Sequence, residues 1–246
     1  MPFICGGFPE PDSTGELLRA CERAGAGIVE VGIPFSDPIA DGPVIAEAMH
    51  RAIGNGVSPS SVLAQIAEAR SSVTVGIVAM VSVSIAMRSG RPEQFVQDAV
   101  QAGVDGFIFP DAPIEESERL IRACREAGAT ASLLVAPTTP AERVARIAEA
   151  CSGFVYVLAR SGLTGERSES PDVGPIVRTL RRTTQLPIAC GFGVSSASHV
   201  RDIVAHADGA IVGSALVRRI SNAFQEGRDP AAETEAFLRE LATGLA

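Results

Sequence analysis

The sequence is poor in aromatic residues and lacks a long apolar run. Its 246 residues include ten Phe, one Tyr and no Trp. The apolar runs are far shorter than the ~20 residues of a transmembrane helix, and the N-terminus shows neither a secretory signal nor an Arg-rich transit peptide. We therefore expect a cytoplasmic protein that does not act on a membrane, in which each aromatic position is informative.

An excess of positive charge and a metal-binding pattern are also missing. The net charge of −8 disfavours nucleic acid or an anionic membrane surface as a partner. The five Cys are odd in number, widely spaced and form no C-x-x-C pair, so we expect buried thiols. The three His lie in helical patterns without metal spacing, which indicates surface or packing roles and no metal site.

Short apolar runs alternate with helical patterns from end to end, which is typical of repeated βα units around a parallel sheet. Eight strands are predicted, near residues 3–6, 27–32, 73–80, 105–109, 130–135, 153–158, 187–190 and 208–212. No linker divides the chain, and its length is normal for a (β/α)8 barrel. A doubly wound sheet is the main alternative, but no Gly-x-Gly-x-x-Gly follows the first strand. We predict an α/β protein with one TIM-barrel domain over residues 1–246.

The second predicted strand carries a carboxylate on its inner face. Side chains alternate along a strand, so Glu30 lies opposite Val29 and Val31, which must face the helices. Glu30 then points into the barrel at its C-terminal end, where active sites of this fold lie. Apolar surroundings would raise its pKa into the range useful for proton transfer. The alternative is a structural glutamate paired with a basic side chain.

The loop after this strand carries two further carboxylates, Asp37 and Asp41, among prolines that restrict its conformation. Asp41 precedes Gly42, Pro43 and a helix predicted over 44–53. The simpler interpretation of Asp41 is therefore a helix-capping aspartate.

The predicted seventh and eighth strands are followed by glycine-rich loops, Gly191-Phe192-Gly193 and Gly213-Ser214. Barrels often bind phosphate on these two loops, at the N-terminus of a helix. The polar segment 159–171 after strand six has the composition of a lid, with a solvated linker as the alternative.

The run from Val29 to Gly42, VEVGIPFSDPIADG, closely resembles the fourteen-residue motif of the tryptophan synthase alpha subunit family. Further matching phrases extend the resemblance over almost the whole chain. The resemblance implies a lyase of tryptophan biosynthesis that cleaves indole-3-glycerol phosphate to indole and glyceraldehyde 3-phosphate by a retro-aldol reaction. It implies no cofactor in this chain, and a pyridoxal-phosphate-dependent beta subunit as the partner.

The resemblance also implies roles for individual residues. Glu30 becomes the acid/base, and Asp41 the acceptor of the indole N–H. The other implied sites are an indole pocket of Phe3, Tyr156 and Phe192, phosphate contacts at Gly165, Gly193, Gly213 and Ser214, a lid residue at Thr164, and a partner interface near Asp37 and Pro38.

Two departures from the family pattern leave alternative functions open. The segment Val81–Met87 replaces a usual aromatic and asparagine, and the sequence starts at strand one, without the usual N-terminal helix that covers the barrel floor. Loss of that helix would expose apolar surface there. A stand-alone or specialised indole-producing lyase is therefore one alternative, and a catalytically weak homologue acting as an allosteric partner is another.

Overall fold

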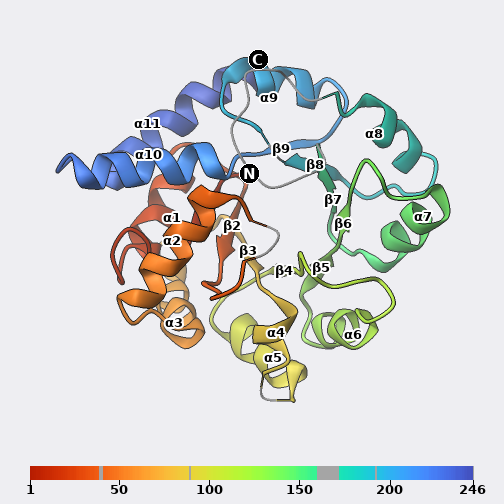
Figure 1. Cartoon of the computed structure of the whole chain (residues 1–246), viewed down its shortest axis with the longest axis horizontal. Coiled ribbons are helices and arrows are strands. Elements are labelled where there is room, and N and C mark those ends of the chain that lie inside the picture. The colour runs from red at the N-terminus through yellow and green to blue at the C-terminus, as the bar shows by residue number, and fades with distance from the viewer. Residues whose placement is uncertain (39–40, 89, 160–171, 192, 246) are drawn as a thin grey trace.

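The computed structural model describes residues 1–38, 41–88, 90–159, 172–191 and 193–245. Parallel strands form a ring, and helices surround it (Figure 1). The strands are β1 Phe3–Cys5, β2 Ile28–Gly32, β3 Gly76–Met80, β4 Gly106–Ile108, β5 Thr130–Ser132, β6 Leu134–Val135, β7 Val155–Leu158, β8 Ile188–Gly191 and β9 Gly209–Ile211. This order and arrangement agree with the predicted (β/α)8 barrel.

The helices alternate with the strands along most of the chain. They are α1 Thr14–Arg23, α2 Pro43–Gly54, α3 Pro59–Arg70, α4 Val83–Ala86, α5 Pro92–Gln101, α6 Glu118–Glu126, α7 Ala141–Ala150, α8 Gly174–Leu180, α9 Ala197–Val204, α10 Ser214–Gln225, α11 Pro230–Ala242 and a 3-10 helix Thr243–Leu245. Their apolar faces pack against the outer side of the strands, as the sequence pattern predicts. None of the helices in the described ranges is both long and apolar enough to cross a membrane.

The ring consists of two hydrogen-bonded sheets, β1 to β5 and β6 to β9. The strand predicted over 130–135 is interrupted at Leu133, whose N–H is directed to Cys151 Sγ (3.2 Å). Its first part pairs with β4 and its second part with β7. At the other junction, a parallel bridge joins Pro2 to Val212. These contacts bring both pairs of sheet edges together.

The strand predicted over 73–80 begins later than expected, at Gly76. The N–H groups of Thr74 and Val75 donate to Glu22 Oε1 (2.6 and 2.9 Å). Because a side chain takes these donors, residues 73–75 do not join the sheet.

Two apolar clusters divide the core. The larger one contains the apolar side chains between strands and helices and also includes Phe3, on the inner side of β1. The smaller one lies inside the ring and consists of Val78, Ile108, Phe154, Tyr156, Ala189 and Ile211. All five cysteines are buried free thiols, as predicted.

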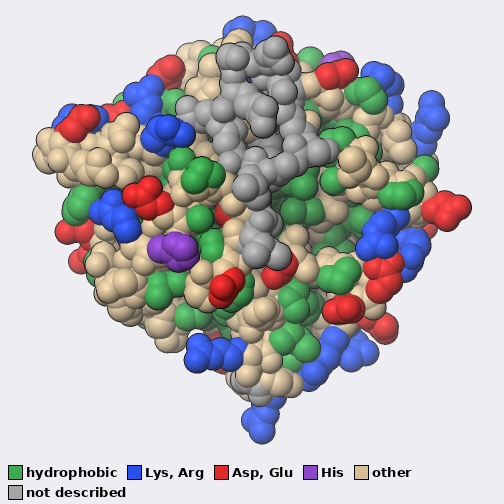
Figure 2. Space-filling model, in the orientation of Figure 1, with side chains coloured by type: hydrophobic (Ala, Val, Ile, Leu, Met, Phe, Trp, Pro, Cys, Tyr) green, Lys and Arg blue, Asp and Glu red, His purple; other side chains and the backbone are tan. Residues whose placement is uncertain are grey.

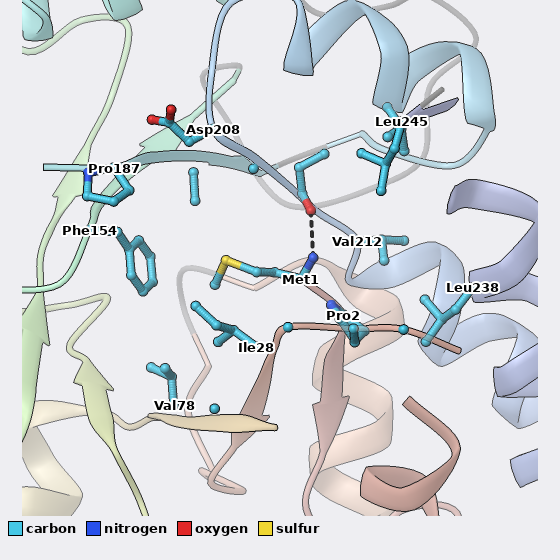
Figure 3. Close-up of a pocket in the computed structure, with 18 of the residues that line it drawn as sticks. Met1, Pro2, Ile28, Val78, Phe154, Pro187, Asp208, Val212, Leu238 and Leu245 are labelled. Atoms are coloured by element: carbon cyan, nitrogen blue, oxygen red, sulfur yellow. Dashed lines mark hydrogen bonds between the residues drawn. The ribbon is translucent and has the colours of Figure 1, made fainter. Parts of the chain in front are cut away.

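The N-terminal ends of the strands surround an apolar cavity of about 540 Å³, the floor cavity. Met1, Ile28, Val78 and Phe154 line it from the strand side, and Leu238 of α11 lies across from them (Figure 3). The amino terminus donates to Ala210 O at 3.0 Å beside it.

Candidate active site

Glu30 points into the ring, as strand alternation predicts. It stands in register with Val78, a member of the inner cluster, while its neighbours Val29 and Val31 pack in the outer one. Glu30 is fully buried, and neither carboxyl oxygen has a hydrogen-bond partner among the described residues. The alternative of a structural glutamate paired with a basic side chain therefore has no support within those residues.

The burial of Glu30 changes its acidity. Desolvation penalises the charged form and raises the pKa of Glu30 from 4.5 to about 8, although the positive amino terminus of Met1 acts in the opposite direction. A carboxyl group with this pKa carries a proton at neutral pH. It can donate that proton and take one back without a large energetic penalty.

Asp41 lies at the same end of the barrel, in the loop that follows β2. Its backbone N–H donates to Pro38 O (3.1 Å), and its side chain is half-buried. Burial, followed by the negative charge of Asp111, raises the pKa of Asp41 from 3.8 to about 6. The N-cap of α2 is Gly42, and no described side chain makes a cap hydrogen bond to this helix. Asp41 is thus not the capping residue that the simpler interpretation expects.

Two aromatic residues of the predicted indole pocket lie inside the barrel. The Phe3 ring covers Gly32, where an added Cβ would lie 2.5 Å from Phe3 Cζ, so only glycine leaves room for it. Tyr156 is buried, and its hydroxyl approaches Gly191 in the same way. Burial and the negative charges of Glu30 and Asp41 raise the pKa of Tyr156 well above 10.

The loops after β8 and β9 are neighbours, because these two strands pair directly. Gly193 adopts φ +80°, which favours glycine, and His199 Nδ1 lies 3.1 Å from its carbonyl oxygen. Gly213 is the N-cap of α10, with no side-chain cap, and Ser214 begins the helix. His199 is buried and positions the Gly193 loop, which agrees with the packing role expected for the histidines.

Phe192, Thr164 and Gly165 lie outside the described residues. Asp37 is exposed and Pro38 is half-buried. The Asp37 loop is held by His50, whose Nε2 lies 2.9 Å from Ser36 O.

Sequence reasoning missed the role of Asp111, which follows β4. Its carboxylate accepts hydrogen bonds from Ser82 Oγ (2.6 Å) and the Val83 N–H (2.9 Å). Asp111 and Asp41 line the same small cavity. Its position just beyond the carboxyl end of a barrel strand is the feature that could have identified it.

The surface around the site carries charges of both signs. On the face shown in Figure 2, acidic and basic side chains are interspersed around the rim of the barrel. The described residues contain no group of three or more His, Cys, Asp or Glu side chains placed to hold a metal ion.

Comparisons with known proteins agree with the geometry. The family model described as "Tryptophan synthase alpha chain" matches residues 1–246. The chain is 44% identical over 225 residues to the tryptophan synthase alpha chain of Prochlorococcus marinus (strain MIT 9313), covering 91% of this chain and 82% of that protein. It is 45% identical over 222 residues to the alpha chain of Roseiflexus castenholzii, covering 89% and 85%.

Solved structures show the same likeness. The alpha subunit from Legionella pneumophila str. Paris superposes with a TM-score of 0.90 at 32% identity, covering 99% of this chain and 91% of that one. A chain of the tryptophan synthase complex from Pyrococcus furiosus superposes with a TM-score of 0.87 at 34% identity, covering 98% and 95%. From its sequence, its fold and the inward-facing Glu30, the chain belongs to the tryptophan synthase alpha chain family.

Proposed function

We propose that residues 1–246 act as one barrel domain that cleaves indole-3-glycerol phosphate to indole and glyceraldehyde 3-phosphate. The observation that carries this proposal is Glu30, a fully buried carboxyl group with no described partner and a pKa raised to about 8. A group left in this state is costly for folding, and active sites are where such groups are retained.

Protonated Glu30 starts the reaction by giving its proton to the indole ring carbon that bears the glycerol phosphate chain. The ring becomes a cation that can accept an electron pair. The resulting Glu30 carboxylate then takes the proton of the neighbouring hydroxyl group, the carbon–carbon bond breaks, and its electron pair returns to the ring. Indole and the aldehyde form, and Glu30 ends protonated as it began.

Asp41 stabilises the cationic ring. As a carboxylate it accepts the hydrogen bond of the indole N–H, which becomes more acidic when the ring is protonated. A pKa of about 6 leaves Asp41 charged above pH 6, while Glu30 stays protonated below pH 8. Both groups are in the required state in the interval between.

A lysine-based mechanism is not available. Indole-3-glycerol phosphate has no carbonyl group with which an amine could form an imine, and residues 1–246 contain no lysine. We propose that the indole ring itself serves as the electron acceptor and that this chain needs no metal or organic cofactor.

The remaining site residues bind the two ends of the substrate. Phe3, Tyr156 and Phe192 form the slot for the indole ring, and Gly193, Gly213, Ser214 and Gly165 hold the phosphate, with Thr164 closing over the site. Support comes from the buried positions of Phe3 and Tyr156 and from the uncapped N-terminus of α10, where amide N–H groups and the helix dipole favour an anion.

The proposed partner is a tryptophan synthase beta subunit, which would bind pyridoxal phosphate and receive the indole in the cytoplasm. The exposed Asp37 and the adjacent Pro38 belong to this interface. The family membership and the superposition on a chain of a tryptophan synthase complex support the proposal.

One assay tests the proposal and its alternatives. Indole release from indole-3-glycerol phosphate is measured for the purified chain with and without a beta subunit. We expect turnover that rises when the beta subunit is added. Equal activity without it would favour the stand-alone lyase, and no activity in either case would reject the lyase and favour the allosteric homologue.

A further inference from the structure

Asp111 is held rigidly by the segment that departs from the family pattern. Ser82 Oγ and the Val83 N–H each donate to one oxygen of its carboxylate, at 2.6 and 2.9 Å. Ser82 is itself buried and caps α4, where its hydroxyl oxygen accepts from the Ser84 N–H (3.2 Å). Both hydrogen bonds to Asp111 therefore come from a fixed turn.

Asp111 lies close enough to Asp41 for its negative charge to act on it. Both residues line a cavity of about 30 Å³, the mouth cavity. Its other lining residues are Ile33, Phe35, Asp37, Pro38, Met49, Met80, Ser82 and Pro110. None of these described lining residues is basic, so none of them compensates the negative charge of Asp111.

Two other ionisable groups among the described residues interact with Asp41, and neither offsets this charge. They are the Cys5 thiol on β1 and the Tyr156 hydroxyl on β7, and burial keeps both neutral by raising the pKa of each. Asp37, in the same loop, is acidic too. The negative charge of Asp111 adds to the effect of burial on the pKa of Asp41.

We propose that Asp111, fixed by Ser82 and Val83, is a positioning residue that makes Asp41 a stronger hydrogen-bond acceptor for the indole N–H. Two neighbouring carboxylates repel each other in the resting enzyme, and the cationic ring relieves that repulsion as it forms. The inference rests on the proposed lyase function. It also assigns a role to the unusual segment after β3: Ser82 and Val83 hold the Asp111 carboxylate in place.

The direct test follows the titration of Asp41 by NMR in protein labelled at the aspartate carboxyl carbons, with the Asp41 resonance assigned by its loss in D41N. We expect a midpoint near pH 6 in the unaltered protein, as its raised pKa implies. Removing the neighbouring charge in D111N or D111S should lower this midpoint by at least about 0.5 pH unit. D98N removes an aspartate from the outer helix α5 and should leave it unchanged. An unshifted midpoint in both Asp111 variants would overturn the inference.

Kinetics supply the second readout. In D111N, the acidic limb of kcat/KM for indole-3-glycerol phosphate should move to lower pH, and kcat should fall by at most about tenfold, the equivalent of one pKa unit. A merely structural Asp111 would lower activity without moving the limb, and that result contradicts the inference. Because the NMR titration needs no turnover, inactivity of the unaltered protein would reject the lyase, whereas an unshifted Asp41 in an active enzyme would reject only the role of Asp111.

Discussion

The carboxylates at the two ends of the barrel differ in their exposure and in their hydrogen-bond partners. At the floor, Asp105 accepts from the Ile77 N–H (2.8 Å) and pairs with Arg70 (2.5 Å). Asp208 repeats this arrangement with the Ile188 N–H (2.7 Å) and Arg181 (2.5 Å). At the mouth, Glu30 is fully buried and has no described partner.

This difference separates carboxylates that stabilise the fold from those that are left for chemistry. The floor aspartates are about half-exposed, and each carboxylate has a backbone N–H donor and an arginine partner. Burial at the mouth raises the pKa of Glu30 and of Asp41. Under the proposed function, carboxylates thus serve stability at one end of the barrel and catalysis at the other.

The largest expected effect is the loss of turnover in Glu30→Gln. Glutamine cannot exchange a proton, so indole release should fall by roughly a thousandfold, within the range for general acid–base groups. D105A is the matched change at the floor and should keep kcat within about twofold. Abundant residual activity in the Glu30 variant would remove Glu30 from its role.

The second effect concerns stability. The folded state holds a proton on Glu30 up to pH 8, whereas the unfolded chain releases it near 4.5, so the free energy of unfolding falls as pH rises between these values. E30Q has no ionisable group at this position, so its free energy of unfolding lacks this pH-dependent decrease. Relative to the unaltered protein, its free energy of unfolding should rise by about 2–4 kcal/mol between pH 5 and pH 8. Urea unfolding at both pH values measures the difference, and parallel changes in the two proteins would argue against a raised pKa.

Substitution of the floor aspartates should lower the stability of the protein without changing the pH dependence of turnover. D105A or D208A leaves a strand N–H without its acceptor and an arginine without its partner, which should lower the free energy of unfolding by about 1–2 kcal/mol. Urea unfolding beside D98A, which alters an exposed helix position, provides the comparison. If a floor variant instead changed the pH dependence of turnover, the division between the two ends would fail.

The smallest effect is the shape of the pH profile. Because Asp41 must be charged and Glu30 protonated, kcat/KM should be bell-shaped, with apparent pKa values of about 6 and about 8, and should fall about tenfold per pH unit beyond each. D41N should lose the acidic limb while the basic limb remains. A profile that keeps rising above pH 9 would contradict the protonated state of Glu30.

The barrel fold and the placement of several site residues could be predicted from the sequence, because they depend on local periodicity. Alternation in β2 fixes the inward direction of Glu30, and the repeated βα pattern gives the barrel and places Gly193 and Gly213 on adjacent loops. Contacts between distant segments left no local pattern. The break at Leu133 depends on the sulfur of Cys151, and the anchoring of Asp111 by Ser82 joins loops after two different strands.

Titration of the Glu30 carboxyl group tests the central claim most directly. In protein labelled at the glutamate carboxyl carbons, the resonance that disappears in E30Q can be followed by NMR from pH 4 to pH 10. We expect its midpoint at about 8, because burial without a partner raises the pKa of Glu30. A midpoint near 4.5 would show an ordinary, solvated or paired carboxylate and would contradict the account.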